Sequence, residues 1–165
     1  MFYLSNLKSV PFEINCTTDR AMTCEGMFDG SSFETLPVVN YCRPDSLENM
    51  FNSCYYLKEV PDKFFDGFNW DTINSSTTSN IFAYLYGNCR SLRQASLVPF
   101  ANANPNTNYN RAYWYSSLFS GTYVLDELID LPIPYVSTWT KNSFGNDWLK
   151  NCYRLANLTF ETPNN

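Results

Sequence analysis

Cysteines are the first side chains of this sequence whose type could support chemistry. There are six, and the chain has no histidine and no C-x-x-C pair. Structural zinc usually takes four cysteine or histidine ligands in close-spaced pairs, and disulfide scaffolds are denser in cysteine. We therefore expect no metal, no cofactor and mostly free thiols, with a disulfide between Cys16 and Cys24 left open for an oxidising compartment.

The acidic residues offer little support for catalysis. Asp126, Glu127 and Asp130 form their densest group. A glycosidase holds two carboxyl groups about 5–10 Å apart across a sugar, but neighbouring residues of a strand point to opposite faces. A serine nucleophile would lack a histidine base, and the chain has no G-x-S-x-G motif. We expect a solvated acidic row and no enzyme.

Residues 47–61, LENMFNSCYYLKEVP, contain the pattern that must organise the fold. Leu47, Met50, Phe51 and Cys54 are spaced i, i+3, i+4 and i+7, which predicts a short helix. The following LKEVP predicts a short strand closed by proline. Neither piece can bury its apolar face alone, so each needs a similar unit stacked on it.

Degraded copies of this stretch recur along the chain. The apolar residue that opens each strand recurs at intervals of 26, 24, 35, 33 and 30 residues, at positions 7, 33, 57, 92, 125 and 155. These periods lie in or just above the range of leucine-rich repeats, and their variation predicts insertions at 62–80, 101–110 and 133–147. The periodicity predicts an α/β, leucine-rich-repeat-like solenoid of about five to six units, each with a short strand and a short helix, over a single domain at 1–165.

The units SLENMFNSCYYLKEVP, YLYGNCRSLRQASLVP and WLKNCYRLANLTF resemble the BspA-like leucine-rich-repeat family. Its repeat has a Met-Phe-x-x-Cys segment followed by a leucine and a short strand. The resemblance covers nearly the whole chain and implies adhesion or partner binding by an extended surface, without catalytic machinery, on bacteria, some protozoa or phage. Ser31 and Thr122 replace the cysteine of the repeat, so we expect Cys54, Cys89 and Cys152 to fill space rather than react.

Two groups of residues are candidates for binding a partner. If strand side chains alternate, one polar row faces the open side of the sheet: Ser9, Thr35, Glu59, Gln94, Glu127 and Asn157. The bulky rings of Trp70 and Trp139 lie in inserted loops, where they could serve as contact residues. Trp148 instead occupies the position of Met50 in the repeat and is predicted to lie in the core.

The charge and composition of the chain exclude some classes of partner. The net charge of −5 argues against nucleic acid, and no stretch approaches the roughly 20 apolar residues of a membrane span. The chain enters in the middle of a repeat at Met1, so its solenoid ends look open. We therefore expect part of a longer protein, or an assembly with neighbouring copies or subunits stacked on those ends.

The sequence thus predicts a non-enzymatic binding or structural module that presents a solenoid face and aromatic loops to a protein or glycan. Its expected location is extracellular, on a cell surface or in a virion, as in an adhesin or virion appendage. The alternative from another class is a glycan-processing enzyme that uses Glu59 and Glu127 on neighbouring strands. A purely structural decoration subunit is a third interpretation.

Overall fold

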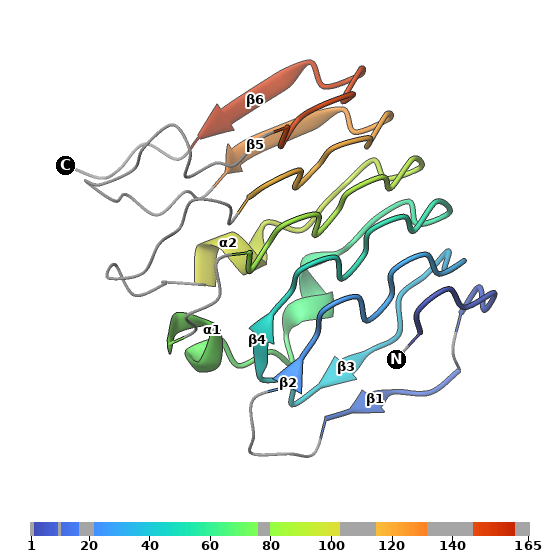
Figure 1. The fold of residues 1–165 in the computed structure, drawn as a ribbon, viewed down its shortest axis with the longest axis vertical. Coiled ribbons are helices and arrows are strands. Elements are labelled where there is room, and N and C mark those ends of the chain that lie inside the picture. The colour runs from blue at the N-terminus through green and yellow to red at the C-terminus, as the bar shows by residue number, and fades with distance from the viewer. Residues whose placement is uncertain are drawn as a thin grey trace.

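The computed structural model describes residues 2–9, 11–16, 22–75, 80–102, 115–131 and 147–160. Within them the chain winds through successive turns that stack along the long axis of the molecule (Figure 1). The strand β1 (Ile14–Asn15) lies at one end of this stack and β6 (Asn157–Phe160) at the other. Each turn of the chain thus rests on the turn before it.

Regular elements are short, and every strand pairing in the described residues is parallel. The strand β1 pairs with β3 (Val39–Asn40), β2 (Met22–Thr23) with β4 (Pro44–Ser46), and β5 (Glu127–Leu131) with β6. Isolated parallel bridges join Cys42 to Phe68 and Glu59 to Gln94. Three short helical segments complete the elements: the 3₁₀ helix η1 (Asp62–Phe65), α1 (Asp71–Ser75) and α2 (Val98–Asn102).

The short helix expected from Leu47 to Cys54 is wrong: this segment is a series of hydrogen-bonded turns. The Met50 N–H donates to the Leu47 carbonyl at 3.1 Å, and the Cys54 N–H donates to the Phe51 carbonyl at 3.1 Å. Apolar spacings of three and four fit a pair of tight turns as well as a helix. The turns prevail because alternate N–H groups, such as that of Phe51, donate to carbonyls of the next turn of the chain.

The same pair of tight turns recurs throughout the stack. Each copy contains two residues with a left-handed backbone, four positions apart: 26 and 30, 49 and 53, 84 and 88, 117 and 121, and 147 and 151. Hydrogen bonds join successive copies in constant register, from Phe28 N–H to Met50 O, Phe51 to Leu85, Tyr86 to Leu118 and Phe119 to Trp148. We call these copies the turn rungs.

The core runs the length of the stack as a column of aromatic rings. Ring centroids of successive turn rungs lie 5.7, 5.6, 5.8 and 5.4 Å apart, with interplanar angles of 1°, 4°, 5° and 16°, in the order Phe2, Phe28, Phe51, Tyr86, Phe119. Leu57, Leu92 and Leu125 are buried beside this column, whereas Leu7 is 49% exposed. Trp148, expected in the core, is half-buried and packs against it.

Candidate binding site

The polar row expected on the strand face is exposed wherever the structure describes it. Glu59 lies directly opposite Gln94, and Glu127 directly opposite Asn157. Ser9 and Thr35 are exposed as well. The structure therefore places two pairs of the six residues side by side on neighbouring strand segments.

Glu59 and Glu127 do not lie on neighbouring strands, which corrects the geometry that the glycan-processing hypothesis assumed. The segment of Gln94 pairs with that of Glu59, and Glu127 lies on β5, which follows the next turn rung along the stack. Two strand spacings of about 4.8 Å separate their backbones by nearly 10 Å. The neighbouring-strand pairing that the hypothesis assumed is therefore not formed, because the segment of Gln94 stands between the two glutamates.

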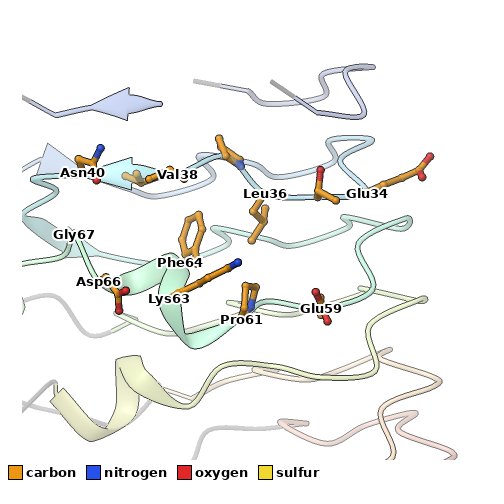
Figure 2. Close-up of a pocket in the computed structure, with 13 residues that line it drawn as sticks. Glu34, Leu36, Val38, Asn40, Glu59, Pro61, Lys63, Phe64, Asp66 and Gly67 are labelled. Atoms are coloured by element: carbon orange, nitrogen blue, oxygen red, sulfur yellow. The ribbon is translucent and has the colours of Figure 1, made fainter. Parts of the chain in front are cut away.

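Part of the row opens into a groove of about 460 Å³ between two successive turns of the chain (Figure 2). Residues 34–40 form one side, and Glu59, Pro61 and the η1 segment form the other. Thr35 and Glu59 belong to both the row and the groove, whereas Glu127 does not line the groove. We call this feature the strand-face groove.

The strand-face groove combines an apolar lining with a charged rim. Its apolar side chains are Leu36, Pro37, Val38, Val39, Pro61 and Phe64. Val38 is 54% exposed, while Phe64 is buried and contacts the rings of Phe28 and Phe51. The apolar lining is therefore anchored in the aromatic core, with Val38 left uncovered.

Charges of both signs surround this lining. Lys63, Asp66 and Glu59 are exposed at the rim. Glu34 forms an ion pair with Lys8 at 2.8 Å, and the hydrogen bond and charge of Lys8 lower the pKa of the Glu34 carboxyl. Glu34 is thus an ionised, paired carboxylate rather than a proton donor.

Gly67 permits the two sides of the groove to approach. A Cβ at this position would collide with the Val39 carbonyl oxygen and with Asn40 Cα. The Gly67 carbonyl accepts the Cys42 N–H at 2.8 Å, which fixes the end of the groove. Only a glycine fits so near another backbone.

Sequence reasoning missed most of the groove because η1 lies within 62–80, which composition marked as a loop insertion. Pro61 directly before Asp62 was the available signal, since proline favours the start of a helical segment. Trp70, the loop aromatic expected to bind, is half-buried and stacks on Phe68 at 5.7 Å. Trp139 lies outside the described residues.

Thiols provide a second place to look for chemistry, and all six are free. Cys24 and Cys42 are buried with their Sγ atoms 3.2 Å apart, so Cys24 faces Cys42 rather than forming the disulfide with Cys16 that the sequence left open. Burial raises the pKa of Cys16 to about 11, with a smaller contribution from Cys42. Reactive cysteines have lowered pKa values, so this arrangement favours packing.

Among the described residues, no group of three or more ligating side chains could hold a metal ion.

The remaining cysteines donate to the backbone. The Sγ atoms of Cys54, Cys89 and Cys152 lie 3.0, 2.9 and 3.0 Å from the carbonyl oxygens of Phe28, Phe51 and Phe119, each in the preceding turn rung. Burial raises the pKa of all three thiols, that of Cys54 to about 11. The protonated thiol that can donate is therefore favoured.

No family model, curated protein or solved structure matches this chain. In the part of the chain that the structure describes, no helix is long and apolar enough to cross a membrane.

Proposed function

We propose that this chain is a non-enzymatic binding module whose stacked turns form a leucine-rich-repeat-like solenoid. It presents the strand-face groove and the polar row to a partner at an external surface, as in an adhesin or a virion appendage. The resemblance of its repeats to the BspA-like family points the same way. The observation that carries the proposal is the exposed apolar lining around Val38, held between rows of exposed polar side chains.

A protein segment is the partner that suits this groove. Protein interfaces have an apolar centre and a polar rim, and the groove offers Val38 and Pro61 inside a rim that includes Glu59, Lys63 and Asp66. Its volume of about 460 Å³ accommodates a few side chains of a peptide. Opposite charges along the rim would fix the direction of the bound segment.

Selection of peptides from a random displayed library tests this proposal. We expect selected peptides to bind the native chain and to lose at least about tenfold in affinity to Val38→Asp, because a charge would be buried on binding. Phe12→Asp is the control, since Phe12 is comparably exposed and does not line the groove. Peptides that bind both variants equally well would contradict the groove as the site.

Analysis of sugar products tests the alternative hypothesis that the chain is a glycan-processing enzyme. The chain is incubated with a panel of oligosaccharides, alongside the Glu59→Gln and Glu127→Gln variants. We expect no cleavage by any of the three proteins. Cleavage that disappears in either variant would replace the binding proposal with the glycan-processing one.

A further inference from the structure

A second surface feature shares no lining residue with the strand-face groove and lies at the corner where each turn rung meets its strand. The residues that directly follow Cys54, Cys89, Thr122 and Cys152 form an exterior stack, Tyr55, Arg90, Tyr123 and Tyr153. The Arg90 guanidinium carbon lies 4.7 Å from the centroid of the Tyr55 ring and 5.8 Å from that of Tyr123. Tyr123 and Tyr153 stack with centroids 5.6 Å apart.

Cation–π contacts on two rings hold the Arg90 guanidinium in place. The planar guanidinium retains N–H donors at its edge, a geometry that matches carboxylate and sulfate oxygens. Tyr153 is 77% exposed and Tyr55 42%. The stack therefore offers a positioned cation with uncovered aromatic surface nearby.

Next to this stack is a depression of about 450 Å³ lined by Lys58, Arg90, Ser91, Arg93 and Val124. Lys58 and Arg93 belong to neighbouring strand segments, because the Arg93 N–H donates to the Lys58 carbonyl at 2.8 Å and the residues that follow them, Glu59 and Gln94, pair. Like charges facing each other on neighbouring strands repel. Three cations thus converge on one hollow at a cost that an anion would relieve.

Within the residues that the structure describes, no carboxylate supplies that anion. The ion pairs of Lys8, Lys150 and Arg154 lie elsewhere, and none involves Lys58, Arg90 or Arg93. Lys58 contributes least to the lowered pKa of Glu34, which is already bonded to Lys8. Three of the eleven lysines and arginines of a chain with net charge −5 therefore line one depression without an ion-pair partner.

We propose that this cationic depression binds an acidic saccharide, with the carboxylate or sulfate of the sugar on Lys58, Arg90 and Arg93. The Tyr55 ring beside Arg90 keeps that guanidinium in place, and the Ser91 hydroxyl can donate to or accept from a sugar hydroxyl. A volume of about 450 Å³ suits one or two sugar units. This site does not depend on the strand-face groove, so either can fail alone.

Calorimetric titration of the full chain with matched acidic and neutral sugars tests the site. The probes are sialyllactose against lactose, trigalacturonate against maltotriose, a heparin-derived tetrasaccharide, and sodium sulfate alone. We expect binding of at least one acidic sugar that weakens with added salt, and no binding of the neutral ones. Arg90→Ala should weaken it at least about tenfold.

Three further variants separate the contributions. Lys58→Ala with Arg93→Ala should abolish binding, and Tyr55→Ala should weaken it, because the Tyr55 ring holds the Arg90 guanidinium in place. Lys150→Ala is the matched control, because Lys150 is an exposed cation paired with Asp147 at 3.0 Å outside the depression. Circular dichroism and the unfolding midpoint verify that each variant is folded.

Several results would overturn the inference. Absence of binding to every acidic sugar by the folded native chain is the simplest. Equal binding of lactose and sialyllactose would remove the charge argument, and binding of sulfate with no gain from any sugar would reveal an anion site only. A loss caused equally by Lys150→Ala would show that general charge, not this depression, attracts the ligand.

Discussion

A small side chain with an S–H or O–H group follows each turn rung, at one position that holds cysteine, serine or threonine. The Thr122 Oγ1 donates to the Phe119 carbonyl at 2.7 Å, and the Ser31 hydroxyl lies 3.5 Å from Cys54 Sγ. Cys54 itself donates to the Phe28 carbonyl, which already accepts the Ser31 N–H at 3.0 Å. The position therefore requires a small side chain that can donate a hydrogen bond, and sulfur is one of three solutions.

This role predicts a loss of stability at alkaline pH. Because the pKa of Cys54 is raised to about 11 in the folded chain, the unfolded chain, with a thiol pKa near 8.5, releases the proton first. The contribution of Cys54 to the free energy of unfolding should therefore be constant below about pH 8 and fall as pH rises towards 11, by about 3 kcal/mol in total. Urea denaturation at half-unit pH steps measures this.

Cys54→Ser isolates the contribution of this thiol, because serine keeps a donor near the Phe28 carbonyl and does not titrate in this range. We expect the curve of the variant to be shallower between pH 9 and 11, with a constant offset from the native chain below pH 8. Curves that remain parallel across the whole window would show that Cys54 titrates alike in both states.

Phe51 is the central ring of the aromatic column and should be costly to truncate. It is fully buried, stacks on Phe28 and Tyr86 at 5.6 and 5.8 Å, and meets Phe64 edge-on. Phe51→Ala should lower the free energy of unfolding by about 3–5 kcal/mol, as for other buried aromatic residues. Chemical denaturation measures it, with exposed Phe12→Ala as the control. A loss below about 0.5 kcal/mol would place Phe51 outside the cooperative core.

Among elements, the paired tight turns determine where the backbone is left-handed. Gly30 and Ser53 occupy the same position in successive turn rungs, with φ of 65° and 58°. Their N–H groups donate in the same way, to Asn52 O and Gly87 O, both at 2.8 Å. The left-handed backbone is therefore a property of the turn rung rather than of either residue.

Exchanging these residues should change stability in opposite directions. Ser53→Gly removes a left-handed cost of about 1–2 kcal/mol and adds about 0.5–1 kcal/mol of backbone entropy, for a net gain of about 0.5–1 kcal/mol. Gly30→Ala incurs the left-handed cost and places a Cβ 2.5 Å from Leu4 Cδ2, so it should lose about 1–2 kcal/mol. Thermal and urea unfolding of both variants measure the changes; a loss from Ser53→Gly would contradict the turn geometry.

The apolar periodicity of the sequence predicted which residues are buried, but it wrongly predicted a helix from Leu47 to Cys54. The positions of Leu57, Leu92 and Leu125 identified buried residues because burial depends on an apolar repeat, which a single sequence displays. The nature of the segment from Leu47 to Cys54 depends on hydrogen bonds to carbonyls of another turn of the chain, and such partners are invisible in local spacing.

In the candidate sites, too, some features could be predicted from the sequence and others only from the structure. Glu59 and Gln94 could be placed in one row from strand alternation. The apolar lining of the groove could not, because it requires η1 to pack Phe64 against Phe28 and Phe51. The cationic depression depends on Lys58 and Arg93 meeting across 35 residues, a register that becomes readable only once the turn rungs are aligned.

On the scale of the whole molecule, the two surfaces lie at different parts of the same repeated turn. The strand-face groove uses the strand and the residues after it, whereas the cationic depression uses the corner between turn rung and strand. Lys58 and Glu59 are adjacent in sequence and both exposed, between the buried Leu57 and Val60, yet they line different sites. One short exposed segment can therefore support two contacts.

Stacking also predicts how the molecule opens. When rungs contact mainly their neighbours, stability is a sum of local and nearest-neighbour terms. Leu4 is 63% exposed, whereas Phe51 is fully buried in the aromatic column. The Leu4 N–H bonds to Asp29 O at 2.8 Å, and the Phe51 N–H to Leu85 O at 3.0 Å. The two hydrogen bonds are similar in length, so bond length alone predicts the same protection of both amides against hydrogen exchange. If the exposed turn around Leu4 opens independently of the buried rungs, the Leu4 amide should exchange with solvent at least about a hundredfold faster than that of Phe51.

Hydrogen exchange followed by NMR resolves these amides one by one. Protection should rise from Leu4 to Phe28 to Phe51, because each further rung opens only after the one outside it. In Phe51→Ala the profile should lose its central maximum, and the Phe28 and Tyr86 amides should exchange faster, since both rings stack on Phe51. Equal protection of Leu4 and Phe51 would instead require one all-or-none opening, in which the turns form a single cooperative unit rather than a stack of coupled ones.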